Sequence, residues 1–123
     1  LVSVSQAIAR CLEPGIDHVA RFGGEEFLVV LAGHNADRAM TVAEAIRASV
    51  AALGLPNPGS PINGKVTISI GVATAPLDTP ARPAWLMLKS DGALYAAKRR
   101  GRNCAMEHKD TTPAEFSENS IAS

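Results

Sequence analysis

The stretch of sequence that decides the fold is Gly23-Gly24-Glu25-Glu26-Phe27, in which two glycines are followed at once by two adjacent carboxylates. Residues 18–22 before it have the character of a strand, and residues 27–32 after it form a continuous apolar run typical of a central strand. The motif is therefore predicted to lie at the tip of a β-hairpin. Taken alone it allows two interpretations: the glycines serve a turn and the glutamates are solvated, or the carboxylates are presented to a metal.

Two further segments favour the second interpretation. Residues 91–103 (DGALYAAKRRGRN) predict a helix whose basic C-terminal end runs into a glycine stop, followed by Arg and Asn. Residues 66–73 (VTISIGVA) predict a strand, because apolar residues alternate with small or polar ones. Together with residues 21–27 (RFGGEEF), these segments closely resemble the GGDEF domain of diguanylate cyclases, in a variant that reads GGEEF.

Length and composition agree with one globular domain. The chain has 123 residues, of which 46% are hydrophobic and 20% charged. Its longest apolar run, residues 27–32, is far shorter than the roughly 20 residues of a spanning helix, so we expect no membrane segment. Twelve basic and twelve acidic residues give zero formal net charge, so we expect no nucleic-acid partner and only local phosphate binding.

The cysteines and histidines predict neither a disulfide framework nor a zinc site. Cys11 falls in a predicted helix and Cys104 in a predicted strand, which is typical of buried thiols in a reducing cytoplasm. His18, His34 and His108 lack the spacing and the cysteine partners of a zinc site, so we expect them to be structural or exposed. We therefore predict a cytoplasmic, and by resemblance bacterial, protein.

Apolar residues that recur every three to four positions predict three helices. The first covers residues 1–12 and is stopped by Pro14-Gly15. The second is capped by Asn35 and ended by Gly54, and the third has Pro83 in its first turn. The residues expected to face the core are Val4, Ile8, Cys11 and Leu12 in the first helix, Ala39, Val42, Ala43, Ile46, Val50 and Leu53 in the second, and Leu86, Ser90, Ala93, Leu94 and Ala97 in the third.

The order of these elements predicts an α+β sandwich. The strand over residues 66–72 carries small residues on one face, which leaves room for a close neighbour, and a short strand is expected over residues 103–107. A mostly antiparallel central sheet with flanking helices accommodates this order. The resemblance implies the same palm-like, ferredoxin-like architecture, with residues 1–107 forming the C-terminal two-thirds of a GGDEF domain. Residues 108–123 are predicted to be a polar, mobile tail.

The resemblance implies a reaction between two GTP molecules. Two facing domains, hence a homodimer, each hold one GTP, and the two nucleotides condense into cyclic di-GMP, a bacterial second messenger, with release of pyrophosphate. Such chemistry needs positioning, Mg²⁺ or Mn²⁺, and neutralisation of the triphosphate. Glu25 and Glu26 suit a hard cation, and the resemblance places Glu25 also near the attacking ribose hydroxyl. Gly23 and Gly24 would let the backbone approach the nucleotide closely.

Lys98 and Arg102 match the basic residues with which this family binds phosphate. Fixed cations near a leaving pyrophosphate stabilise its developing charge. The alternative is capping of the helix, because cations near a helix C-terminus are favourable by about 0.3–1 kcal/mol in any case. We expect Arg99 and Arg100 to do only that, and Asp91 to have a structural role.

The chain departs from the family at its start. Family members begin with a strand that carries a metal-binding aspartate, followed by a helix and a loop whose Asn and Asp recognise guanine, and residues 1–123 contain no match to these parts. We therefore expect the chain to be a fragment that is inactive alone, to leave a sheet edge unpaired, and to follow an upstream sensory or receiver domain.

A second departure concerns inhibition by product. Many family members carry an Arg-x-x-Asp motif before the hairpin, and the matching residues here are Pro14-Gly15-Ile16-Asp17. Only Asp17 is retained, and proline offers no cation to a phosphate, so this inhibitory site is predicted to be degenerate.

Three functions remain open at this point. The first is a diguanylate cyclase; the second is a non-catalytic GGDEF-like module that binds GTP or cyclic di-GMP as a sensor; the third is a structural dimerisation domain. The pair Glu25 and Glu26, with Lys98 and Arg102, favours the enzyme.

Overall fold

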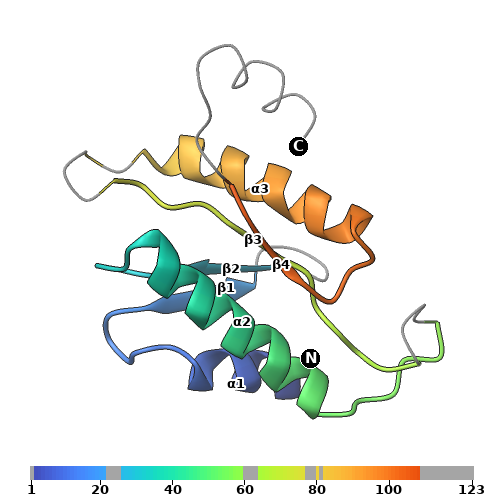
Figure 1. The fold of residues 1–123 in the computed structure, drawn as a ribbon. Coiled ribbons are helices and arrows are strands. Elements are labelled where there is room, and N and C mark those ends of the chain that lie inside the picture. Colours follow the sequence, from blue (N-terminus) through green and yellow to red (C-terminus); the bar gives the residue numbers. More distant parts are fainter. Residues whose placement is uncertain (1, 22–25, 60–63, 77–79, 81, 109–123) are drawn as a thin grey trace.

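The computed structural model describes residues 2–21, 26–59, 64–76, 80 and 82–108. Within these residues three helices and four strands follow one another, as Figure 1 shows. Their order is α1 (Val2–Arg10), β1 (His18–Arg21), β2 (Phe27–Val30), α2 (Ala36–Ala52), β3 (Ile70–Val72), α3 (Pro83–Arg99) and β4 (Ala105–Glu107).

The helix ends follow local chemistry. Asn35 caps α2 as predicted, because its Oδ1 accepts a hydrogen bond from the backbone N–H of Arg38 at 2.8 Å. Gly54 follows that helix with a φ of +62°, the left-handed conformation that glycine adopts without steric cost. Pro83 opens α3, also as predicted. The first helix is shorter than predicted, because residues 11 and 12 form tighter turns in which Cys11 N–H donates to the Ile8 carbonyl at 3.0 Å.

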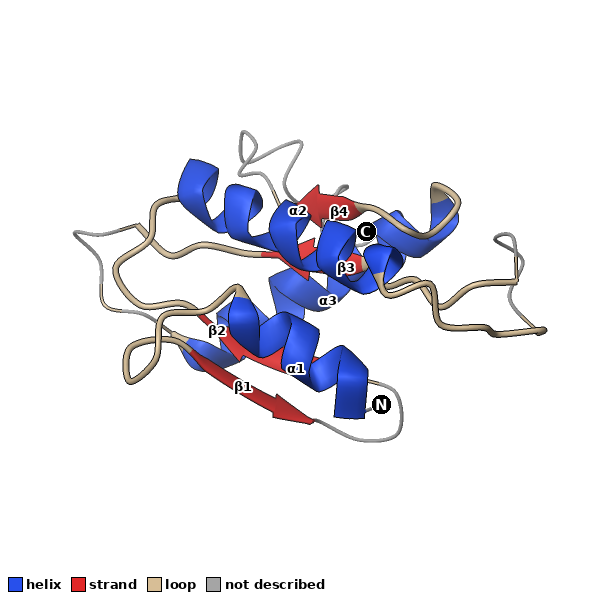
Figure 2. Ribbon diagram, turned by 90° about the horizontal axis from the view of Figure 1, so that it is seen from below, coloured by secondary structure: helices blue, strands red, loops and turns tan. Residues whose placement is uncertain are grey.

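The described strands form two separate two-stranded sheets (Figure 2). β1 and β2 are antiparallel, with Arg21 opposite Phe27, so the predicted hairpin is confirmed. β3 and β4 are parallel, with Ile70 opposite Ala105. The strand predicted over residues 66–72 is confined to its last three residues, because Val66 N–H instead donates to the Leu55 carbonyl at 2.8 Å.

The core lies where α1 and α2 meet. Its buried members are Val4, Ala7, Ile8, Ile46 and Val50, against which half-buried residues of β1, β2 and the 66–70 segment pack. β3 and β4 contact both α2 and α3, and Figure 1 shows this sheet between the two helices. The parallel pair is therefore covered on both faces, as parallel strands require.

Gly71 confirms that β3 leaves room for a close neighbour. A Cβ at this position would collide with the carbonyl oxygen of Ser90 and with the backbone of Leu94 on α3. Only a residue without a side chain lets the helix approach the strand this closely. Ala93 and Ala97, predicted to face the core, are buried on the same helix.

The burial of several other side chains can be compared with the expectations from sequence. Lys89 on α3 is 7% exposed, although the pattern assigned that position no core role. Cys11 and Cys104 are free and half-buried rather than buried. His18 is exposed. His108 is half-buried and packs edge-on against Trp85, with the ring centroids 5.8 Å apart.

The described residues include the three helices α1, α2 and α3. Within them, no helix has both the length and the apolar character that crossing a membrane requires. The tail predicted over residues 108–123 lies outside the described residues except for His108.

Candidate functional site

The hairpin carries the first half of the predicted site. The register puts Arg21 opposite Phe27, so residues 22–26 connect the two strands. Gly23, Gly24 and Glu25 lie outside the described residues. Glu26 is described and exposed, directly before β2. Its carboxylate therefore has access to a ligand at this end of the hairpin.

Asp17 holds the opposite end of the hairpin together. It is 7% exposed, and its Oδ2 accepts a hydrogen bond from the backbone N–H of Glu13 at 3.0 Å. Its Oδ1 accepts another from the backbone N–H of Ala32 at 3.2 Å. The N–H of Glu13, and then that of Ala32, hold the pKa of Asp17 below its ordinary value despite the opposing effect of desolvation. Both carboxylate oxygens therefore serve the fold, before β1 and after β2.

The C-terminal end of α3 carries the second half of the predicted site. Lys98, in the last turn, and Arg102, just beyond it, are both exposed. The chain between them turns sharply, because Gly101, Arg102 and Asn103 have φ values of +115°, +65° and +46°. The N–H of Arg102 donates back to the carbonyl of Ala97 at 3.1 Å, which closes the helix end. The two cations predicted to bind phosphate are thus carried by one short segment.

This turn has an unusual backbone. Arg102 and Asn103 are the non-glycine residues with positive φ in the described part of the chain. A left-handed conformation costs an ordinary L-residue about 1–2 kcal/mol, and asparagine tolerates it better than most. Such a conformation persists where neighbouring contacts determine it.

One of those contacts comes from α2. The Nη1 of Arg47 donates to the side-chain oxygen of Asn103 at 3.1 Å. The same guanidinium donates from Nε to Glu44 Oε1 at 2.7 Å and forms an ion pair with it through Nη2 at 2.6 Å. The Arg47 hydrogen bond lowers the pKa of Glu44. Sequence reasoning missed Arg47; the available signal was the opposite charge three positions away on the same helix.

The neighbouring arginines, Arg99 and Arg100, lie at the same end of α3. The guanidinium carbon of Arg99 lies 5.8 Å from the centroid of the Tyr95 ring, on the surface of α3. Arg100 is the exposed C-cap residue, and Asp91 is exposed in the middle of the helix.

The structure brings together some predicted residues and not others. Lys98 and Arg102 share the end of α3. Among the described elements, neither strand of the hairpin contacts α3. The strands next to Glu26 therefore do not pack directly against the helix that carries Lys98. A ligand that contacts both Glu26 and the two cations must span the distance between them.

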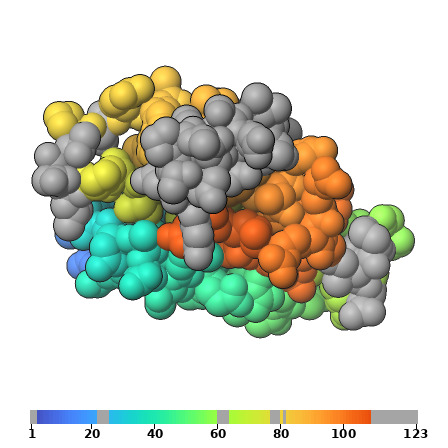
Figure 3. Space-filling view, turned by 45° about the horizontal axis from the view of Figure 1, so that its top comes forward, coloured from blue at the N-terminus to red at the C-terminus, as the bar shows by residue number. Residues whose placement is uncertain are grey.

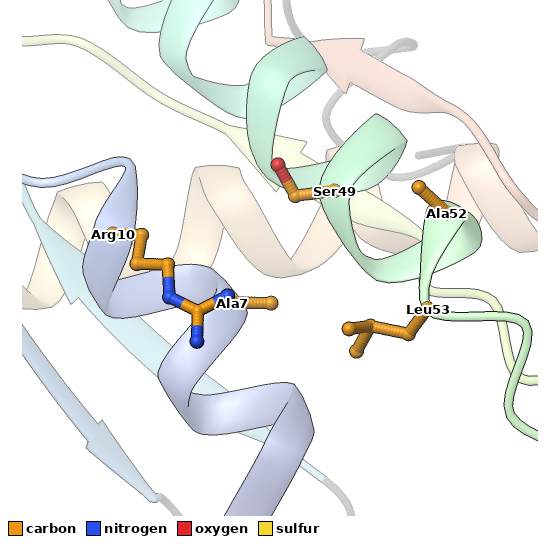
Figure 4. A pocket seen from close by; sticks show the side chains of 5 residues that line it. All are labelled: Ala7, Arg10, Ser49, Ala52 and Leu53. Carbon is orange, nitrogen blue, oxygen red and sulfur yellow. The ribbon is translucent and has the colours of Figure 1, made fainter.

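A shallow depression of about 270 Å³ lies elsewhere, between α1 and α2. Figure 4 shows its lining, in which the Arg10 side chain runs along one wall beside Ala7, and Ser49, Ala52 and Leu53 form the other. None of the predicted site residues lines it. Its volume is below the range of about 300–1,000 Å³ that is usual for ligand pockets, so it is no competitor for the nucleotide site.

Comparison with known proteins decides the family. A family model described as "Diguanylate cyclase, GGDEF domain" matches residues 1–104. The chain belongs to the GGDEF domain family. It is 40% identical over 113 residues to diguanylate cyclase A of Treponema denticola, covering 92% of this chain and 29% of that protein. It is 42% identical over 101 residues to the probable diguanylate cyclase DgcT of Escherichia coli K12, covering 82% of this chain and 22% of that protein.

Solved structures confirm the α+β palm-like fold. The GGDEF domain of DgcB from Caulobacter crescentus, in complex with c-di-GMP, superposes with a TM-score of 0.72 at 29% identity, over 88% of this chain and 62% of that one. The active GGEEF domain of a diguanylate cyclase from Vibrio cholerae gives a TM-score of 0.71 at 28% identity, over 90% and 67%. The chain thus spans less than a third of these two curated relatives and about two-thirds of these solved domains.

The hairpin of this GGDEF domain offers oxygen atoms, the type of ligand that a hard divalent cation prefers. Glu26 supplies an exposed carboxylate, and Mg²⁺ is commonly held by one or two carboxylates together with substrate phosphates. Within the described residues no group of three His, Cys, Asp or Glu side chains could hold a metal by protein ligands alone.

Proposed function

We propose that the protein carrying this GGDEF domain is a diguanylate cyclase, which condenses two GTP molecules into cyclic di-GMP with release of pyrophosphate. The observation that carries the proposal is the end of α3, where Lys98 and Arg102 are exposed on a segment with an enforced left-handed turn. Relatives named diguanylate cyclase, at 40% and 42% identity, support the same reading. The Vibrio cholerae GGEEF domain, called active, supports the view that glutamate at the variable position is compatible with turnover.

Each proposed residue has a role that its chemistry allows. Lys98 and Arg102 bind the triphosphate and stabilise the charge that develops on the leaving pyrophosphate. Gly23 and Gly24 let the hairpin backbone approach the nucleotide, since a side chain there would keep it away. Glu25 and Glu26 would hold Mg²⁺ or Mn²⁺, and the resemblance to the family implies that Glu25 would also act near the attacking 3′-hydroxyl. When bound, the metal supplies Lewis-acid activation of that hydroxyl and neutralises phosphate charge.

The proposal includes a homodimer and a signalling context. The product contains two nucleotides, and each GGDEF domain holds one of them, so two domains must face each other. The proposed place of action is the bacterial cytoplasm, which supplies GTP. An upstream sensory or receiver domain is proposed as the input. The Pseudomonas aeruginosa cyclase SiaD has been solved in complex with its activator SiaC, which supports control of this fold by a partner.

A sensor that binds cyclic di-GMP without turnover is the second candidate. The Caulobacter crescentus GGDEF domain in complex with c-di-GMP favours it, because that structure has the fold of this chain. Pro14 in place of an arginine and the use of both Asp17 oxygens by the backbone count against a receptor at the usual inhibitory position. A purely structural dimerisation domain would have no need of exposed Lys98 and Arg102.

Product formation separates these candidates. Purified protein that carries residues 1–123 in their natural context is incubated with Mg²⁺ and GTP, and cyclic di-GMP and pyrophosphate are measured. The enzyme forms both in a ratio of one to two; the sensor binds nucleotide without product, and the structural domain does neither. Residues 1–123 alone are expected to give no product, because the solved domains extend beyond the 62–67% that this chain covers.

A further inference from the structure

Arg47 lies on α2 but contacts the turn that carries Arg102. Its Nη1 is 3.1 Å from the side-chain oxygen of Asn103, and 56 positions separate the two residues in the sequence. On the face drawn in Figure 3, β4 lies between α2 and the C-terminal half of α3, so the turn from α3 into β4 is close to α2. This contact joins the proposed phosphate-binding segment to the helix that builds the core.

The turn is held at both ends by its backbone. At its start the N–H of Arg102 donates to the Ala97 carbonyl at 3.1 Å. At its end the carbonyl of Cys104 accepts from the N–H of Ile70 at 2.9 Å, which begins the pairing with β3. Asn103 lies between these two anchors with a φ of +46°. Between the two backbone anchors, the side chain of Asn103 makes its contact with Arg47.

Arg47 is itself oriented by a second contact. Glu44, one turn earlier on α2, accepts from Nε and Nη2, which leaves Nη1 directed at Asn103. The side chain of Arg47 is 23% exposed, compared with 56% for Glu44. A planar guanidinium can serve two partners in fixed directions, which the single ammonium group of lysine cannot do with the same geometry.

We propose that Arg47 is a positioning residue for phosphate binding: it holds Asn103 in the left-handed turn and thereby fixes the direction in which Arg102 leaves the end of α3. It touches no substrate. The effect of Arg47 on phosphate binding rests on the proposed function. Its effect on the conformation of the turn rests on the geometry alone. Arg47 thus couples α2 to the affinity for the triphosphate without being a ligand of it.

The test uses four single variants, and the double variant Arg47→Met with Asn103→Gly, of protein that carries residues 1–123 in their natural context. Arg47→Met removes the fork and keeps a side chain of similar length, and Arg47→Lys keeps the charge. Asn103→Gly removes the partner oxygen and keeps the left-handed backbone accessible. The matched control is Arg38→Met, an exposed arginine near the start of the same helix. For each protein, calorimetry measures the binding of magnesium GTP, and a thermal melt gives the melting temperature. NMR measures the three-bond couplings between the amide and α protons of residues 102 and 103, which report their φ angles.

The expected result is a coupled loss of affinity. Arg47→Met weakens magnesium GTP binding about 3- to 10-fold and changes the couplings of Arg102 and Asn103. Arg47→Lys gives an intermediate loss, and Arg38→Met gives none. In the Asn103→Gly background, Arg47→Met has no further effect on affinity, because the contact it removes is already gone.

Two results overturn the proposal, and they are distinguishable from failure of the proposed function. Unchanged couplings and affinity in Arg47→Met contradict the positioning role, even if that variant melts at a lower temperature. Independent, additive losses for Arg47→Met and Asn103→Gly contradict the path through Asn103. If wild-type protein that carries residues 1–123 in their natural context does not bind magnesium GTP, the proposed function and the phosphate-binding role are both contradicted. The couplings of Arg102 and Asn103 then decide whether Arg47 positions the turn.

Discussion

The carboxylate of Asp17 accepts a hydrogen bond from the backbone N–H of Ala32 at 3.2 Å, which ties the chain before β1 to the chain after β2. Its other oxygen accepts from the N–H of Glu13 at 3.0 Å. Glu26, directly before β2, is at the far end of the same hairpin. Asp17 therefore fixes the base of the element whose tip is proposed to carry the metal ligands, a structural task that a purely inhibitory reading of this residue overlooks.

Replacing Asp17 is expected to change how stability depends on pH. Its folded-state pKa is depressed, so its contribution is present above the pKa of an unfolded aspartate, about 3.9, and is lost as the pH falls through the folded value. Asp17→Asn should lower the melting temperature at pH 7 and flatten the fall in stability between pH 5 and pH 2. A thermal melt at pH 7 measures the first effect, and urea melts between pH 5 and pH 2 measure the second. Asp37→Asn, at an exposed position, is the control, and an acid dependence identical to wild type in Asp17→Asn would show that other groups carry it.

Product inhibition at the position before the hairpin is expected to be weak. Arginine binds phosphate through a bidentate, charge-assisted fork that Pro14 cannot supply, and both Asp17 oxygens are already engaged. Micromolar cyclic di-GMP should slow turnover little, and Pro14→Arg should create inhibition if the turn tolerates it. Tight cyclic di-GMP binding in calorimetry that Asp17→Asn abolishes, in a variant that remains folded, would contradict this expectation.

Gly71→Ala is expected to destabilise the fold by about 1–3 kcal/mol or more, because the added methyl group meets backbone atoms of Ser90 and Leu94 that cannot move independently of α3. Gly59→Ala is the matched control, since its Cβ would have only an ordinary contact with Asn57 at 3.8 Å. Denaturant melts of both variants measure the difference. Equal stability of the two variants would contradict the close packing of α3 on β3.

Alanine substitutions of the basic residues at the end of α3 are expected to fall into two classes by their effect on triphosphate binding. Lys98→Ala and Arg102→Ala should each weaken triphosphate binding about tenfold and reduce its dependence on salt, with little change in melting temperature, because both side chains are exposed. Arg99→Ala and Arg100→Ala are the controls. Titrations with magnesium GTP at two salt concentrations measure the effect, and equal losses in all four variants would favour a general electrostatic role of the helix end.

Features that depend on local sequence could be predicted. The cap at Asn35, the stop at Gly54 and the start at Pro83 each follow from the conformational preference of one residue and its near neighbours. The hairpin around residues 23–27 followed from two apolar runs and a glycine pair. Ala39, Ala43, Ile46 and Val50 are buried as the helical period of α2 predicts.

Features that depend on tertiary contacts could not be predicted. Arg47 and Asn103 are far apart in sequence, and no periodicity joins them. The predicted strand over residues 66–72 loses its first half because Val66 bonds to Leu55, a partner that the strand pattern does not identify. Lys89 is buried although its charge favours solvent. The roles of Glu25, Gly23 and Gly24 stay predictions, since these residues lie outside the described part of the chain.

The central claim is that the carboxylates of the hairpin tip serve cyclic di-GMP synthesis. The most direct measurement is the initial rate of cyclic di-GMP formation from GTP and Mg²⁺ by protein carrying residues 1–123 in their natural context, compared with its Glu25→Gln, Glu26→Gln and Glu13→Gln variants. The account predicts a measurable rate for the wild type and for Glu13→Gln, and a loss of at least about 100-fold for Glu25→Gln and Glu26→Gln at unchanged melting temperature. A near-normal rate in either hairpin-tip variant would contradict it.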